Sequence, residues 1–201
     1  MSSLCSSLAE LSSLLTSCAA LETVVNDAGQ AIMDCLLNER KVLTCGNGGS
    51  AADALHLSEE LVGRYKGDRR ALPAICLNAD VTALTCISND YGYDRVFSRQ
   101  VEALGRPGDV LVGFTTSGNS PNVLGAFRRA KDMGLVTVFL GGKDGGLAKG
   151  LCVHEIIVPS STTARIQEVH TLILHQWLEV IESFDWTSIP NVRCQKFIPN
   201  T

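Results

Sequence analysis

The sequence predicts an α/β protein of the flavodoxin-like, doubly wound class, with a five-stranded parallel sheet flanked by helices and additional N-terminal helices. Five short apolar runs recur between residues 42 and 158, and helical patterns alternate with them. Near-continuous apolar strands are typical of a parallel sheet covered by helices on both faces. The length of 201 residues fits one such domain with a helical appendage. The predicted strands are 42–45, 74–77, 110–114, 136–140 and 155–158.

Residues 1–38 form the predicted helical appendage. Apolar residues recur at every third or fourth position between Ser2 and Leu37, which indicates an amphipathic helix, and we expect one break within residues 21–26. Because an exposed apolar stripe needs a partner, we expect this segment to pack against other copies in an oligomer. Residues 39–186 then make the α/β domain, and 187–201 form a tail that we expect to be irregular.

Charge is distributed unevenly along the chain. Residues 1–39 contain no Lys or Arg, so all 17 basic residues and 16 of the 21 acidic residues follow them. The formal net charge of −4 argues against a nucleic-acid-binding protein, which normally carries a basic surface. Since the rest of the chain is close to neutral, any bound anion must be held mainly by groups other than surplus positive charge.

The cysteines and the N-terminus bear on the compartment. None of the eight cysteines forms a CxxC pair, and most lie in apolar runs, which favours small buried hydrophobes in a reducing compartment over a disulfide framework or a zinc knuckle. No basic segment precedes an apolar stretch, so a secretory signal is not expected. We expect no run to approach the ~18 apolar residues of a membrane span. We therefore expect a cytoplasmic protein without membrane association.

Two loops rich in Gly and in hydroxyl side chains follow predicted strands, where ligands of doubly wound sheets bind. The first is Gly-Asn-Gly-Gly-Ser at 46–50, and the second is Thr-Thr-Ser-Gly-Asn-Ser at 115–120, before a helix expected over 122–133. Glycines allow close approach of a ligand, and the following helix N-terminus offers free N–H groups. Either loop alone could equally be a tight turn with capping serines, and neither is a nucleotide P-loop. Together they favour phosphate binding.

The helix after the first loop carries His56 and Glu60. These residues are four apart and therefore lie on one helical face. A His and a carboxylate one turn apart suit zinc, or a catalytic base held by a histidine. Taken alone, such a pair is more often an ordinary surface contact.

The last predicted helix, 163–184, carries Gln167 and His175. Their separation of eight residues corresponds to about 12 Å of helical rise, so both could reach one ion only if it lay midway between them or if a second subunit contributed. His170, on the same helix, and His154 are expected to be structural histidines rather than ligands.

Several further segments complete a set of motifs that covers residues 36–182. They are Asp53, 56–65, 89–93, 116–120, 142–146, 165–170 and His175, in addition to the loop at 46–50. In combination they resemble the phosphoheptose isomerases of the sugar isomerase (SIS) fold. The resemblance implies a homotetramer. It also implies conversion of sedoheptulose 7-phosphate to D-glycero-D-manno-heptose 7-phosphate, toward the heptose of lipopolysaccharide or of nucleotide-activated heptoses.

The resemblance also implies roles for individual residues. Glu60 would be the base and His175 the acid of an isomerisation through a cis-enediol, assisted by one Zn²⁺ per site. Two positions depart from the family pattern: Thr115 stands where Ser is common, and Ala164 stands where some members carry Asp. The implied zinc ligands are His56, Glu60, Gln167 and His175. The implied substrate-binding residues are Asn47, Gly48, Ser50, Asp90, Thr115, Thr116, Ser117, Ser120 and Gln167.

Two alternatives stay open at this point. A non-catalytic SIS protein that binds a partner, similar to the DnaA initiator-associating protein, would share the loops and the run at 165–168, but it would lack the set of His56, Glu60 and His175. Another sugar-phosphate enzyme of the SIS fold, such as an amino-sugar isomerase or a muramic acid phosphate etherase, would usually be longer or lack the helical His/Glu pair. The presence of all three side chains favours the isomerase.

Overall fold

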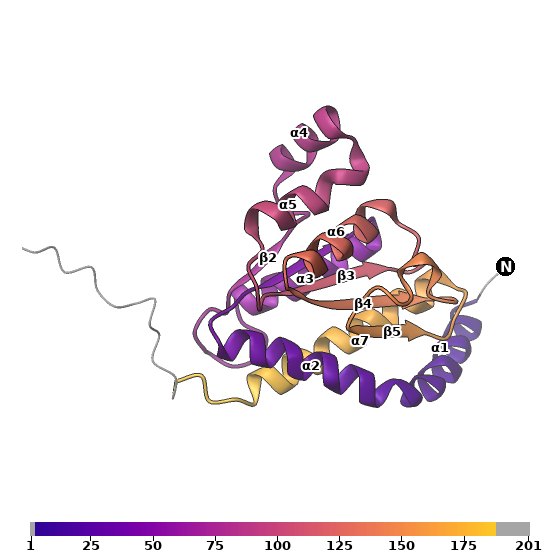
Figure 1. The fold of residues 1–201 in the computed structure, drawn as a ribbon. Coiled ribbons are helices and arrows are strands. Elements are labelled where there is room, and N and C mark those ends of the chain that lie inside the picture. Colours follow the sequence, from indigo (N-terminus) through magenta and orange to yellow (C-terminus); the bar gives the residue numbers. More distant parts are fainter. Residues whose placement is uncertain (1–2, 188–201) are drawn as a thin grey trace, which may run out of the picture.

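The computed structural model describes residues 3–187, which form a helix–sheet–helix sandwich (Figure 1). Five parallel strands lie in the order β2-β1-β3-β4-β5, so the crossover reverses between β1 and β3. This is the predicted flavodoxin-like class, and each predicted strand is found within two residues of its expected ends. The strands are β1 Val42–Gly46, β2 Ala74–Cys76, β3 Val110–Thr115, β4 Val136–Gly142 and β5 His154–Val158.

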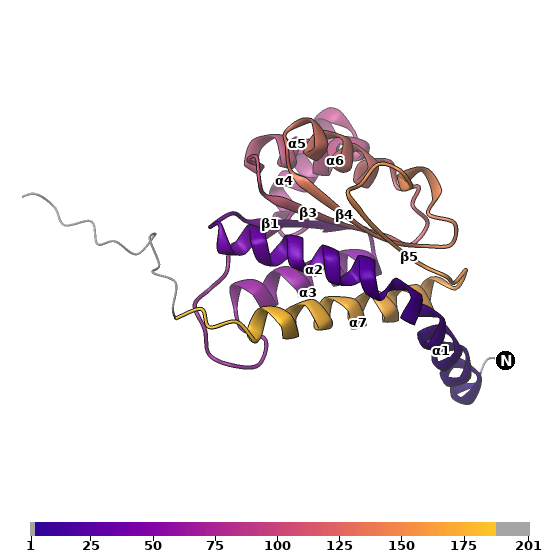
Figure 2. The same cartoon turned by 60° about the horizontal axis from the view of Figure 1, so that its bottom comes forward.

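Helices cover both faces of the sheet. Figure 2 shows α2, α3 and α7 beneath the sheet and α5 and α6 above it, while α4 stands away from the sheet beyond α5 in Figure 1. The α-helices are α1 Leu4–Cys18, α2 Glu22–Leu37, α3 Gly49–Val62, α4 Val81–Tyr91, α5 Val96–Leu104, α6 Pro121–Asp132 and α7 Thr163–Glu182. Short 3₁₀ turns are η1 Ala19–Leu21, η2 Tyr93–Arg95 and η3 Gly146–Ala148.

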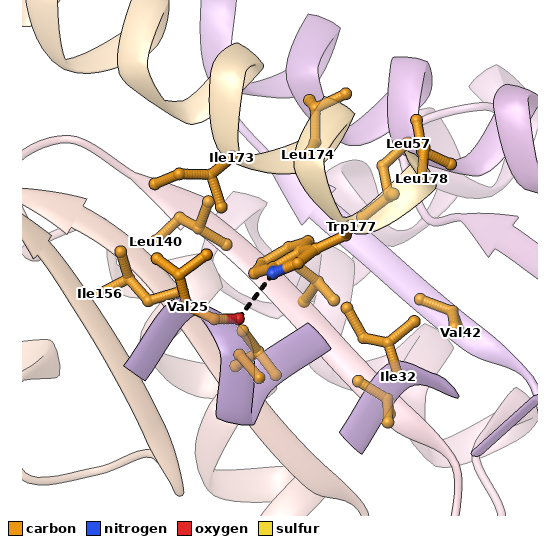
Figure 3. Packing of buried hydrophobic residues seen from close by; sticks show 14 of the residues in the cluster. Val25, Ile32, Val42, Leu57, Leu140, Ile156, Ile173, Leu174, Trp177 and Leu178 are labelled. Carbon is orange, nitrogen blue, oxygen red and sulfur yellow. Dashed lines mark hydrogen bonds between the residues drawn. The ribbon is translucent and has the colours of Figure 1, made fainter. Parts of the chain in front are cut away.

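Each face of the sheet has its own hydrophobic core. Between the sheet and helices α2, α3 and α7, the indole of Trp177 is buried and its Nε1–H donates to the carbonyl of Val25 at 2.8 Å (Figure 3). On the opposite face, Phe127 and Phe139 meet edge to face with 5.9 Å between ring centroids. The indole bond ties α7 to α2, so the helix that carries His175 is fixed to the N-terminal segment as well as to the sheet.

The N-terminal segment breaks slightly earlier than predicted. The 3₁₀ turn lies at Ala19–Leu21, and α2 continues without interruption through Asn26 and Asp27. The reason is packing: the buried face of α2, which includes Val25 and Ala28, holds these two poor helix formers in the helix. Among the residues of α1, only Leu14 is buried.

The first helix is tied to the start of α7. The Arg165 guanidinium donates to the Ser7 carbonyl at 2.8 Å, and the Thr162 hydroxyl donates to Glu10 at 2.7 Å. Elsewhere α1 is open: Leu4 and Leu8 are 75% and 56% exposed. This apolar surface fits the expected oligomer packing, which stays a prediction.

The segment Leu4–Leu37 is long and apolar enough to cross a membrane by length and composition. The expectation that no stretch approaches this limit was therefore wrong. The qualifying stretch of 18 residues is only 6% buried in the protein, although Ile32 and Leu36 in α2 are fully buried. The 3₁₀ turn also interrupts the segment, so length and composition alone do not define it as a membrane span.

The cysteines in residues 3–187 are all free. Three are buried as predicted, two are half-buried, and Cys5 and Cys86 are exposed. The buried ones are Cys35, Cys45 and Cys76. Cys194 and almost all of the predicted irregular tail lie outside the described residues.

Candidate active site

A cavity of about 320 Å³ opens beyond the carboxyl ends of β1 and β3. Both Gly- and Ser-rich loops contribute to its wall, and the first turn of α7 closes it. This is the position at which a doubly wound sheet binds ligands, because the two strands lead their connections in opposite directions. The lining residues are Asn47, Gly49, Ser50, Phe114, Thr115, Thr116, Ser117, Ser120, Thr163 and Gln167.

The lining of the cavity offers hydrogen-bond donors but no formal positive charge. None of its described lining residues is Lys, Arg or His. Instead, the starts of three helices meet there: Gly49 begins α3, Ser120 precedes α6, and Thr163 begins α7. Helix N-termini carry free N–H groups and partial positive charge, and the hydroxyl side chains add further donors. The near-neutral composition of the chain after residue 39 is consistent with such a site.

The second loop is braced from outside the cavity. Its two ends are joined by a 3.0 Å hydrogen bond between the hydroxyls of Thr115 and Ser120. Gly118 adopts φ of 66°, and a Cβ at this position would lie 1.9 Å from the carbonyl oxygen of Gly145, so only glycine fits. The Ala148 N–H then donates to the Gly118 carbonyl at 2.9 Å. The segment around η3 therefore supports the loop from behind.

Next to the cavity, a second group of polar side chains gathers between α3 and α7. The Nε2 atom of His56 lies 3.5 Å from Glu60 Oε1, and the His56 ring meets the His175 ring edge to face at 5.0 Å between centroids. The Tyr65 ring stacks on the His175 ring, with 5.6 Å between centroids. Two predicted residues on one helix and a third on the last helix are thus brought together.

This histidine cluster, which consists of His56, Glu60 and His175, offers a donor set suited to zinc. Imidazole nitrogens and a carboxylate are typical zinc ligands. Glu59 adds a second carboxylate, because the potential ligand atoms of His56, Glu59 and Glu60 all lie within 4.8 Å of one another. We did not predict Glu59, although its position three residues after His56 would have indicated it.

Helices α3 and α7 lie side by side with their chains running in the same direction, and three contacts join them. A Cβ at Gly49 would come within 2.5 Å of Gln167 Nε2, so the missing side chain makes room for this amide. One turn further on, the Thr171 hydroxyl donates to Asp53 Oδ1 at 3.0 Å. The third contact is the His56–His175 ring pair.

The three contacts explain where Gln167 and His175 lie. Both residues face α3, but Gln167 belongs to the cavity and His175 to the histidine cluster. The Gln167 amide packs against Gly49, and the Gln167 backbone carbonyl accepts a hydrogen bond from Thr171. The predicted role of Gln167 as a zinc ligand stays a prediction.

Asp53 lies between the cavity and the histidine cluster. Its side chain is buried, and within the described residues its Oδ2 atom has no hydrogen-bond partner. Burial raises the pKa of Asp53, while the hydrogen bond from Thr171 and the nearby His56 act in the opposite direction. Asp53 belonged to the recognised motifs, but no role was assigned to it from the sequence.

The position of Tyr65 depends on a half-buried ion pair between Arg69 and Glu182 at the end of α7. Glu182 accepts hydrogen bonds from the N–H of Gly67 at 2.9 Å and from Arg69 Nε at 2.8 Å. Arg69 in turn donates to the carbonyls of Glu60 and Leu61 at the end of α3. Burial opposes ionisation of Glu182, but these donors outweigh it and lower its pKa. The loop after α3 is therefore clamped to α7.

Two predicted substrate contacts lie outside the cavity lining. Gly48 precedes α3 as its N-cap residue. Asp90 is exposed near the end of α4, where it accepts a hydrogen bond from Asn89 Nδ2 at 2.8 Å. Conversely, Gly49, Phe114 and Thr163 line the cavity without having been predicted, because their roles depend on how the loops and α7 converge.

His170 is a structural residue, as predicted. It is fully buried, and its Nε2 atom lies 3.0 Å from the Gly141 carbonyl oxygen. Burial lowers the pKa of His170 to about 4, so the ring is neutral at pH 7 and Nε2–H donates.

The family follows from comparison with known proteins. Residues 8–142 match the SIS domain family, which is the class that the doubly wound sheet and its anion cavity define. The phosphoheptose isomerase of Campylobacter jejuni is 52% identical over 162 residues, which cover 81% of this chain and 87% of that protein. The chain therefore belongs to the phosphoheptose isomerases of the SIS domain family, as the sequence motifs predicted, and is a sugar-phosphate isomerase.

Solved structures agree with this assignment. The phosphoheptose isomerase of Neisseria gonorrhoeae has a TM-score of 0.83 and 42% identity, covering 90% of this chain and 97% of that one. The phosphoheptose isomerase of Francisella tularensis has a TM-score of 0.78 and 35% identity, covering 89% of this chain and 99% of that one. The likeness thus extends over nearly the whole fold.

Proposed function

We propose that the protein interconverts sedoheptulose 7-phosphate and D-glycero-D-manno-heptose 7-phosphate through a cis-enediol. The observation that carries this proposal is the arrangement along α3 and α7. There, a cavity that is lined by hydrogen-bond donors without charged side chains lies beside the histidine cluster. A phosphorylated sugar has the same two parts: a phosphate at one end and a reactive carbonyl at the other. The names of the relatives at 50–56% identity supply the substrate class.

In this proposal the cavity holds the phosphate. The N–H groups at the starts of α3, α6 and α7 and the hydroxyls of Ser50, Thr116, Ser117 and Ser120 donate to its oxygens. Because these donors are fixed by helices and by the braced second loop, little ordering is required when the anion binds. The sugar then extends along α3 toward Glu60 and His175.

Glu60 and His175 carry the proton transfer. Moving a carbonyl between neighbouring carbons requires a base to take a proton from the carbon beside it and an acid to protonate the developing oxyanion. Glu60 takes the proton from carbon and His175 donates to the oxygen, which gives the cis-enediol. Glu60 then returns a proton to the neighbouring carbon while the hydroxyl on the first carbon gives its proton to His175, so the new carbonyl forms and both residues are regenerated. Tyr65 and His56 pack against the His175 ring, which holds it in a fixed orientation.

His56, Glu60 and His175, with Gln167, would hold a zinc ion. Bound zinc polarises a carbonyl and stabilises negative charge on its oxygen. The mixed nitrogen and oxygen donors of the histidine cluster support this choice of metal.

The wider setting is also part of the proposal. We propose a homotetramer that is assembled partly through the exposed apolar face of α1, with a cytoplasmic location and a place in the synthesis of lipopolysaccharide heptose or of an activated heptose. The measurement is the molar mass in solution of the full chain and of a Leu4→Ser/Leu8→Ser variant. A monomeric full-length chain would contradict the tetramer.

The function is tested by incubating the purified protein with sedoheptulose 7-phosphate and following the aldose product. We expect conversion, loss of conversion after treatment with a chelator, and recovery on addition of zinc. Metal content, measured on the same samples by elemental analysis, gives a readout that does not depend on activity. Absence of conversion by zinc-loaded, folded protein would overturn the proposal. Conversion that persists in metal-free protein would overturn its zinc component.

A further inference from the structure

Two asparagines join the two loops of the anion cavity. Asn47 belongs to the first loop, and Asn122 lies at the start of α6, directly after the second loop. The Asn47 Nδ2 donates to Asn122 Oδ1, and the Asn122 Nδ2 donates to Asn47 Oδ1, each at 2.9 Å. Asn122 is only 2% exposed, whereas Asn47 lines the cavity. The buried amide therefore holds the cavity amide through two hydrogen bonds.

The direction of these bonds is fixed by the backbone. The Val123 N–H donates to Asn122 Oδ1 at 3.0 Å, and a backbone N–H can only donate. Asn122 must therefore present its oxygen to Val123 and its NH₂ group to Asn47 Oδ1. An inverted Asn122 amide would place NH₂ against the Val123 N–H, which leaves two donors in a buried site without acceptors.

Tyr93 adds a second constraint on Asn47. Its hydroxyl donates to Asn47 Oδ1 at 2.9 Å, from the 3₁₀ turn that follows α4. Asn47 Oδ1 thus accepts two hydrogen bonds, which matches its two lone pairs. One hydrogen of Asn47 Nδ2 goes to Asn122, so the only remaining hydrogen-bonding capacity of the Asn47 side chain is one N–H.

We infer that Asn122 and Tyr93 are positioning residues that make Asn47 a pure N–H donor toward the anion in the cavity. A freely rotating asparagine would present its oxygen to an anion as readily as its nitrogen, and the oxygen would repel the anion. Because Val123 orients the buried Asn122 amide, Asn47 is held with its free N–H as the only group available to the ligand before the ligand binds. This inference deepens the proposed function and rests on it only in assigning the cavity to a phosphate group.

The primary test measures binding of inorganic phosphate to the full-length protein by calorimetry. Asn122→Ala removes both bonds to Asn47, so the dissociation constant should rise by about tenfold, the equivalent of one to two hydrogen bonds. Asn47→Ala should weaken binding similarly. Adding Asn122→Ala to Asn47→Ala should then change little, because Asn122 acts through Asn47.

Matched controls separate positioning from general loss of structure. Gln100, on α5, is another buried amide away from the cavity lining; it donates to the carbonyl of Leu77, directly after β2, and to that of Val96. Gln100→Ala should lower the thermal midpoint while leaving the phosphate dissociation constant unchanged. Tyr93→Phe removes only one hydroxyl and should weaken phosphate binding about threefold. Its control is Tyr91→Phe, since the exposed Tyr91 packs its ring against Arg99.

The outcomes are distinct. If Asn122→Ala folds and binds phosphate as tightly as the wild type, or weakens binding equally in the Asn47→Ala background, the inference is overturned. If Asn122→Ala does not fold, Tyr93→Phe decides: binding equal to that of Tyr91→Phe overturns the inference, and weaker binding supports it. A wild-type protein that binds no phosphate would overturn it as well. A wild-type protein that binds phosphate but does not isomerise the sugar would refute the proposed function alone.

In an isomerase assay Asn122→Ala and Tyr93→Phe should raise KM for the sugar phosphate with kcat at saturation unchanged. A purely structural role for Asn122 would instead lower the amount of active enzyme, which reduces kcat and leaves KM unchanged.

Discussion

The hydroxyl of Thr171 donates to Asp53 Oδ1 at 3.0 Å and thereby links the two helices that carry both halves of the site. Thr171 lies one turn after Gln167 and one turn before His175, so this bond sits between the cavity and the histidine cluster. Any sliding of α7 along α3 would break it and would change the distance from the phosphate to the reacting groups. The bond fixes the spacing on which the proposed chemistry depends.

Thr171→Val keeps the shape of the side chain and removes the hydroxyl. We expect the free energy of unfolding to fall by about 1–3 kcal/mol, because both carboxylate oxygens of the buried Asp53 then lack a donor. The measurement is urea unfolding. Thr85→Val is the control, since the exposed Thr85 hydroxyl bonds only to carbonyls of its own helix, and it should have little effect. Equal stability of the two variants would contradict the prediction.

Glu60→Gln should lower kcat at least about a hundredfold, which is the lower end of what general base catalysis contributes. The amide keeps the size of the side chain but cannot accept the proton from carbon. Turnover of sedoheptulose 7-phosphate is the measurement, and Glu102→Gln is the control, because Glu102 pairs with Arg129 at the protein surface. Near-normal turnover by a folded Glu60→Gln protein would exclude Glu60 as the base.

Glu182 and Glu179 provide a matched pair on α7. The half-buried Glu182 accepts from Arg69 and from the Gly67 N–H, so Glu182→Ala should cost about 2 kcal/mol of stability by removing the acceptor of these hydrogen bonds. Glu179 pairs with Lys66 at the solvent-exposed surface, and Glu179→Ala should change stability little. Chemical denaturation of both variants gives the comparison. Equal losses in the free energy of unfolding of the two variants would contradict a special role for the Glu182–Arg69 ion pair.

The buried His170 makes stability depend on pH. Its pKa is about 4 in the folded protein against 6.5 in the unfolded chain, so between these values the unfolded state binds more protons and stability rises with pH. Above pH 6.5 His170 is neutral in both states and no longer makes the free energy of unfolding depend on pH. As the pH falls to 4, the wild type should lose about 3 kcal/mol relative to His170→Gln, which retains a donor for Gly141 but does not titrate. Urea unfolding at several pH values measures this, and parallel pH curves would disprove it.

The fold was predictable because its signals are local. The apolar runs of β1 and β3 are buried along their whole length, and the loops that follow them carry their own turn residues, so sequence patterns located both strands and both loops. The pairing of His56 with Glu60 was predictable for the same reason, because a spacing of four residues places both side chains on one face of a helix.

The remainder depends on contacts between distant elements. No local pattern shows that α3 and α7 run side by side, so the pairing of His56 with His175 and of Asp53 with Thr171 could not be derived. The same holds for Asn122, which looks like an ordinary residue of a helical first turn until the first loop is placed beside it. A helix break was expected within residues 21–26, but α2 runs unbroken from Glu22 because packing of neighbours such as Val25 outweighs the weak helix propensity of Asn26.

The cavity walls contain no described side chain that changes its charge near neutral pH. A site built on Lys or His would gain and lose affinity with its own ionisation. Here the donors at the starts of α3, α6 and α7 keep the same charge throughout, and the phosphate group itself, with a second ionisation near pH 6, is what titrates. Affinity for the sugar phosphate should therefore follow the ionic state of the ligand, while any pH optimum of turnover reports on the proton-transferring groups alone.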